Sequence, residues 1–130
     1  MKIKFAIISE SAFTDAEGRL NIIQTFNIIR ASSFPAIHPR LAIVTNIELD
    51  PKEAAAGTIS QSTEIVHNDS EKILAKSEPV AMKVSQEKNV QFISNFIGLG
   101  FDKPGEYYVN LVIDKKRHSK IASFTVEKSL

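Results

Sequence analysis

The fold class is decided by the stretch DKPGEYYVNLVID, which covers residues 102–114. Proline followed by glycine at positions 104 and 105 is typical of the centre of a type II turn, in which the glycine takes a positive φ. After this turn, large apolar side chains recur at every second position from Tyr107 to Ile113, while Glu106, Asn110 and Asp114 fall on the other face. A period of two indicates a half-buried strand. The stretch therefore predicts a tight turn that leads into a long strand.

The position of Tyr107 just after this turn is similar to that of the tyrosine corner of β-sandwich domains. We therefore predict that Tyr107 is a corner residue. The immunoglobulin core of two cysteines around a tryptophan is absent, because the chain contains neither residue type. "Immunoglobulin-like" describes only the expected architecture.

Strands are also predicted along most of the remaining chain. Alternating or apolar runs separated by polar turns occupy residues 3–7, 20–29, 40–49, 58–67, 73–76, 80–85, 90–101 and 122–126. The run at 90–101 also fits one face of a helix, but Gly98 and Gly100 favour a bent strand. Residues 115–118 are predicted to turn the chain before the last strand.

One short helix is predicted between these strands, at residues 51–56. Asp50 suits the N-cap, Pro51 the first helical position and Glu53 the third position of a capping box. Gly57 suits the residue that follows a helix.

Many short strands with almost no helix predict an all-β fold. We expect one domain over residues 1–130, an antiparallel two-sheet sandwich of Ig-like, Greek-key architecture. The residues predicted to be buried in its core are Phe5, Ile22, Phe26, Ile43, Tyr107, Leu111 and Phe124.

Composition excludes several classes of site. The chain has 130 residues, a net charge of +1 and no cysteine, so disulfides, thiolate metal sites and cysteine nucleophiles are excluded. The apolar run at residues 5–8 is shorter than that of a signal peptide, and no run approaches a membrane span of about 20 residues. We therefore expect a soluble cytoplasmic protein with no membrane partner.

Three short motifs resemble a known family. They are EGRLNII at residues 17–23, FPAIHP at 34–39 and PGEY at 104–107, the last followed by a predicted hairpin. The sequence resembles a group of small bacterial and phage-associated proteins known only as a domain of unknown function. The resemblance spans most of the chain and implies one β-sandwich domain without an assigned activity. The chain departs from the family pattern at residues 80–95, where the strand order stays open.

Motifs for catalysis or cofactors are absent. His38, His67 and His118 lack the spacing of metal ligands, and no G-x-S-x-G sequence marks a nucleophile. The turn after His67 carries oxygen ligands at Asp69 and Glu71, but turn chemistry explains such residues without a metal. We predict no catalytic residue, no metal and no cofactor, although an unrecognised enzyme stays open as an alternative.

The candidate binding surface is the basic cluster Lys115, Lys116, Arg117 and His118, with His38 as a second candidate. A basic hairpin can contact phosphate or RNA. Hairpin tips are also commonly charged simply because they are exposed to water, and lysine at sheet edges blocks unwanted strand pairing. We therefore keep small-ligand or nucleic-acid binding here as an alternative and do not expect a nucleic-acid partner.

An excess of apolar side chains points to another function. The pairs Ile22/Ile23, Ile28/Ile29 and Phe96/Ile97 place bulky groups on both faces of their strands. A two-sheet fold buries only one face of each sheet, so some of these groups need a further cover. We therefore expect a non-enzymatic module for protein–protein interaction or assembly, with self-association as a homodimer included.

Overall fold

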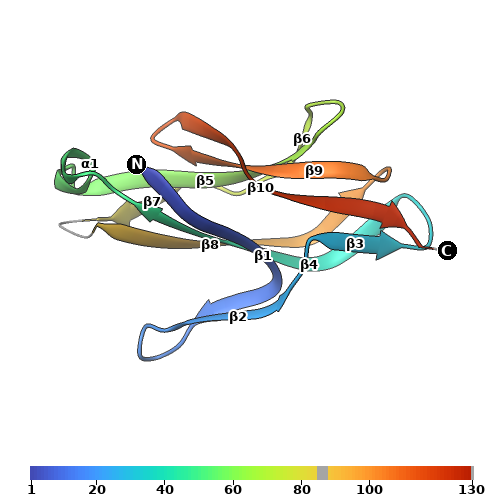
Figure 1. Ribbon diagram of the computed structural model, residues 1–130, viewed down its shortest axis with the longest axis horizontal. Coiled ribbons are helices and arrows are strands. Elements are labelled where there is room, and N and C mark those ends of the chain that lie inside the picture. The colour runs from blue at the N-terminus through green and yellow to red at the C-terminus, as the bar shows by residue number, and fades with distance from the viewer. Residues whose placement is uncertain (85–87, 130) are drawn as a thin grey trace.

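The computed structural model describes residues 1–84 and 88–129, which form two sheets (Figure 1). Sheet A has the strand order β2-β1-β4-β8, and sheet B has the order β3-β10-β9-β5-β6, with β7 also paired to β5. The element bounds are β1 (Lys2–Thr14), β2 (Leu20–Thr25), β3 (Ile28–Ala31), β4 (Ala36–Glu48), α1 (Pro51–Ala55), β5 (Thr58–His67), β6 (Ile73–Lys76), β7 (Val80–Lys83), β8 (Asn89–Phe101), β9 (Gly105–Ile113) and β10 (Lys116–Lys128).

The prediction of a nearly all-β fold with two sheets is confirmed. The finer expectation of an Ig-like Greek-key sandwich is not confirmed, because sheet B curls into a half-barrel. One pair of strands also departs from the predicted antiparallel arrangement, since β3 runs parallel to β10. None of the helices in the described residues is long and apolar enough to cross a membrane.

The main core lies between the two sheets and follows the alternation of the strands. Leu41 and Ile43 of β4 pack there with Ile65, Val109 and Phe124 of sheet B. Because successive side chains of a strand point to opposite faces, Ala42 and Val44 must face away from sheet B. They form a separate apolar cluster on the outer face of sheet A, together with Ala12 and, half-buried, Phe5, Leu20, Ile22 and Ile93. The chain thus covers part of its second apolar face itself.

The predicted core is confirmed for Ile43, Tyr107, Leu111 and Phe124, which are all buried. Phe5, Ile22 and Phe26 are only half-buried, so the prediction that they are buried was wrong. The first two belong to the outer cluster of sheet A, and Phe26 packs against His38 at 5.5 Å between ring centres.

The predicted long strand at residues 20–29 is two strands in different sheets. Gln24 takes a φ of 57° just before β2 ends at Thr25, and the chain then crosses from sheet A to sheet B. The crossing is fixed at both sides, since the Phe26 amide donates to Ile8 of β1 and the Thr125 amide of β10 donates to Asn27. The apolar pattern of the sequence does not indicate this break, because apolar residues recur on both sides of the crossing.

Two turns also differ from the prediction. The reversal before β10 is made by Asp114 and Lys115, which have φ values of 47° and 69° and form a two-residue hairpin turn. Residues 116–118 are already part of β10. Gly105 has a φ of 144°, unlike the roughly 80° of a type II turn. Glycine suits this position because other residues rarely adopt this φ, and because a Cβ would lie at a tight 3.1 Å from His67 Nε2.

The predicted helix start is confirmed. The Asp50 side chain accepts from the Glu53 amide at 2.8 Å, and the Glu53 side chain accepts from the Asp50 amide at 2.9 Å. These two bonds are the capping box, and they satisfy amides that a helix cannot pair internally. The amino group of Met1 lies 2.9 Å from Glu53 and ties the first residue to this helix.

The tyrosine corner is also confirmed and yields a stability prediction. The Tyr107 hydroxyl donates to the carbonyl of Lys103 at 2.8 Å, while its ring stacks on Phe124. Tyr107→Phe is expected to lower the free energy of unfolding by about 1 kcal/mol, because it removes one hydrogen bond and keeps the ring. Urea denaturation measures this change. Tyr108→Phe is the control, and equal stability of the two variants would contradict the prediction.

Candidate functional site

The predicted basic cluster is divided between two faces of sheet B. Lys115 and Arg117 line a cavity of about 350 Å³ on the outer face. His118 alternates with Arg117 along β10 and therefore points to the other face. Lys116 is two residues away on the same strand and therefore shares that face. Burial lowers the pKa of His118, and the charge of Lys116 lowers it further. The structure thus brings together only two of the five residues predicted for this surface, Lys115 and Arg117.

The cavity is lined by side chains from four strands, β5, β6, β9 and β10, and most of them are polar. The register places Ser62, Val112 and Arg117 in one row across β5, β9 and β10, and the next row holds Lys76, Glu64 and Asn110. These side chains share the outer face because Ile65 and Val109, which alternate with them, lie in the core. The full lining is Ser60, Ser62, Glu64, Lys76, Pro79, Val112, Lys115 and Arg117.

Glu64 is the fixed centre of this cavity. Its side chain is 1% exposed and accepts two hydrogen bonds from Arg117, at 2.8 Å from Nε and 3.1 Å from Nη2. Asn110 Nδ2 donates a third bond at 3.3 Å. The Arg117 hydrogen bonds hold the pKa of the Glu64 carboxyl below its ordinary value, against the effect of burial. The carboxylate in turn raises the pKa of Arg117. The pair is therefore charged at neutral pH.

Asn110 links this ion pair to an irregular part of β10. Its Oδ1 accepts from the Lys120 amide at 3.0 Å. Lys120 has a φ of 57° and lies where the pairing of β9 and β10 shifts register between His118 and Ala122. The Lys120 ammonium lies 5.0 Å from the centre of the Tyr108 ring. One buried amide thus fixes both the carboxylate and the bulge beside it.

Glu64, Lys76 and Asn110 were missed by the sequence analysis. Glu64 directly precedes the apolar residues Ile65 and Val66, and Asn110 lies between Val109 and Leu111, and this was the available signal. Their meeting depends on the register of β5 against β9, in which Glu64 faces Asn110. Register cannot be derived from either strand alone.

The three histidines lie in separate places. His38 is half-buried, with Nε2 3.2 Å from the Glu10 carboxylate but without the alignment of a hydrogen bond. It lies on β4 of sheet A and is not among the residues that line the outer cavity of sheet B. His67 is buried against Tyr107 at 4.9 Å between ring centres, and its Nδ1 accepts from the Ser70 amide at 3.3 Å. Within the described ranges, no group of three His, Asp, Glu or Cys side chains is placed to hold a metal ion.

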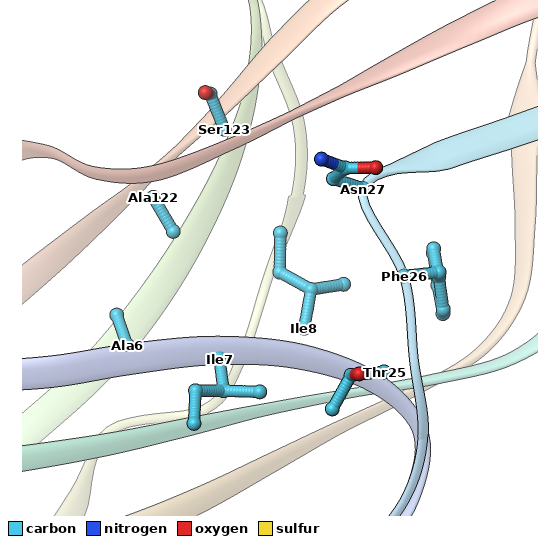
Figure 2. Close-up of a pocket in the computed structure, with 8 residues that line it drawn as sticks. All are labelled: Ala6, Ile7, Ile8, Thr25, Phe26, Asn27, Ala122 and Ser123. Atoms are coloured by element: carbon cyan, nitrogen blue, oxygen red, sulfur yellow. The ribbon is translucent and has the colours of Figure 1, made fainter.

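A second opening of about 490 Å³ lies between β1 and β10, where the chain crosses from β2 to β3 (Figure 2). Figure 2 shows Ile8 reaching into this space, with Ala6 on the same side of β1 and Ile7 on the opposite side. Its polar side chains are the amide of Asn27 and the hydroxyls of Thr25 and Ser123. None of the residues that line it is an acid or a base.

Residues 4–127 match the model of a family of unknown function, DUF6941. The chain belongs to this family. No curated protein matches the chain.

A further feature of this DUF6941 chain is the edge of sheet A. β8 is the last strand of that sheet and pairs with β4 alone among the described residues. It spans 13 residues, and none of them is charged. Ile97 of β8 is 83% exposed and Ile37 of the neighbouring β4 is 74% exposed. Of the apolar pairs noted in the sequence, Ile22, Ile29 and Phe96 are at least half-buried, whereas Ile23, Ile28 and Ile97 remain exposed.

Proposed function

We propose that this chain is a non-enzymatic assembly module that forms a homodimer through the edge of β8. The observation that supports this proposal is the 13-residue edge strand without a charged side chain and with an exposed isoleucine at position 97. An unpaired strand edge presents a row of backbone donors and acceptors, which another strand can satisfy. A long, uncharged edge is therefore the part of this fold best suited to pairing.

The other edge strands differ from β8 in ways that hinder pairing. β3, β6 and β7 have four residues each, and β2 has six. Arg30, Lys76 and Lys83 place a positive charge on three of these short strands. Natural proteins protect sheet edges by short strands and by charges, lysine above all. β8 has neither protection, and only the positive φ of Gly98 interrupts its course.

A second copy of the chain fits this edge better than a charged partner. A two-fold axis pairs identical strands in antiparallel order, so each residue of β8 meets another residue of β8. Because β8 carries no charge, this arrangement opposes no like charges. It also joins two four-stranded sheets into one continuous sheet and brings each exposed Ile97 close to the other copy.

The proposal predicts a dimer that charges on β8 disrupt. Sedimentation velocity at about 100 µM is expected to give twice the chain mass for the wild type, if the Kd is micromolar. The double variant Asn95→Lys/Ile97→Lys is expected to be monomeric, because it opposes like charges at an edge that is exposed in the single chain. Ile23→Lys, on the exposed side of β2, is the control and should remain dimeric. A monomeric wild type would overturn the proposal, as would a double variant that still dimerises.

We also propose the cytoplasm as the location of this assembly and a bacterial or phage origin for the chain. The lack of cysteine supports the first, because reducing compartments do not sustain disulfides. The sequence motifs at residues 17–23, 34–39 and 104–107 support the second.

A further inference from the structure

The outer cavity of sheet B has an excess of positive charge. Its lining contains the cations Lys76, Lys115 and Arg117 and the single carboxylate of Glu64, which gives three minus one, or +2. Glu64 is already paired with Arg117. Lys76 and Lys115 make no ion pair within 4 Å in the described part of the chain, although Lys76 lies opposite Glu64 on the neighbouring strand. The whole chain carries only +1, so the eight lining residues hold more net positive charge than the chain as a whole.

Arg117 is held in a fixed orientation and keeps hydrogen-bond donors that Glu64 does not use. A guanidinium has five N–H groups, and Glu64 accepts two of them, so three remain. The carboxylate that holds it is buried and is itself bound by Asn110, whereas the Arg117 side chain is 53% exposed. A buried acceptor therefore orients an arginine whose free side faces the solvent and the cavity.

We propose that this cavity binds a phosphate monoester group. Its net charge of +2 matches the nearly double negative charge that such a group carries at pH 7. Arg117 supplies a planar fork of donors that suits phosphate oxygens, and Lys76 and Lys115 supply point charges at the rim. Ser60 and Ser62 add hydroxyl donors from β5. The volume of about 350 Å³ accommodates one such group with a small attached residue.

The arrangement favours a monoester over a nucleic-acid backbone. A nucleic-acid strand needs a groove of positive charge with aromatic rings on which its bases stack. Here the charges converge on one cavity, and Lys116 and His118 of the same hairpin point to the other face. The nearby Tyr108 ring already lies against the Lys120 ammonium.

The binding test uses methyl phosphate as the probe, measured by isothermal calorimetry on the full chain. We expect saturable binding with a Kd near 1 mM or below. Lys76→Gln/Lys115→Gln is expected to weaken it by about tenfold or more, since it removes both unpaired cations of the cavity. The control Lys83→Gln/Lys116→Gln removes the same charge from exposed positions outside the cavity and should stay within about twofold of the wild type.

Three results would overturn the proposal: no saturable binding by the wild type, equal losses in the two double variants, or dimethyl phosphate binding as tightly as methyl phosphate. The last result would instead indicate recognition of a phosphodiester backbone. Two further probes identify the source of the phosphate. A phosphoserine tripeptide that binds more tightly than methyl phosphate assigns it to a phosphorylated protein, and glycerol phosphate that does so assigns it to a free metabolite.

Discussion

Leu111→Ala is expected to lower the free energy of unfolding by about 2–5 kcal/mol. Leu111 lies on β9 with 0% exposure and belongs to the core cluster that joins both sheets near α1. Truncation removes its transfer free energy and leaves a cavity that the surrounding strands fill only in part. Because β9 is paired on both sides, with β5 and β10, its backbone has little freedom to close that cavity.

Chemical denaturation of Leu111→Ala and Ile73→Ala side by side tests this expectation. Ile73 loses similar apolar groups but is half exposed on the short strand β6. Surface substitutions usually change stability by about 0.5 kcal/mol or less, so Ile73→Ala should stay below about 1 kcal/mol. A Leu111→Ala cost of the same size as that of Ile73→Ala would mean that the inward face of β9 is assigned incorrectly.

The second large effect concerns the ion pair of the outer cavity. Arg117→Met is expected to lower the Tm by roughly 10 °C at pH 7, because it leaves the buried Glu64 carboxylate without its counter-charge. Glu64→Gln is expected to lower the Tm by only roughly 3 °C, since the exposed Arg117 then regains water. Thermal unfolding followed by circular dichroism measures both values. The reverse order of the two variants would contradict a buried carboxylate.

The same pair predicts a dependence on pH. The pKa of Glu64 is lower in the folded chain than in the unfolded chain because Arg117 donates to its carboxylate. The charged form therefore contributes stability above the unfolded pKa, and this contribution is lost as the pH falls through the folded pKa. In Arg117→Met, protonation of the buried Glu64 carboxylate stabilises the folded chain instead. The Tm difference between the wild type and Arg117→Met should thus narrow from pH 7 to about pH 4, and an unchanged difference would contradict the prediction.

Much of the candidate site could not be predicted from the sequence. The basic cluster was visible as a run, but its division between two faces follows from the turn at Asp114 and Lys115. A turn one residue later would exchange the faces of Arg117 and His118. Likewise, nothing local marks β8 as an edge strand. The sequence shows that β8 carries no charge. That β8 has no neighbouring strand on its second side follows only from the strand order of the sheet.

The sequence by itself determined the features that depend on neighbouring residues. The all-β class followed from alternation, the helix start from Asp50 and Glu53, and the corner from Tyr107 after its Pro-Gly step. These features rest on hydrogen bonds and periodicities that span a few residues. Only the tertiary structure decided which strands became neighbours. It divided residues 20–29 between two sheets, and it brought Glu64 to Arg117 across 53 positions of the chain. Such contacts depend on the register and curl of whole sheets. Many weak side-chain contacts together set this register and curl, and no single sequence motif encodes them.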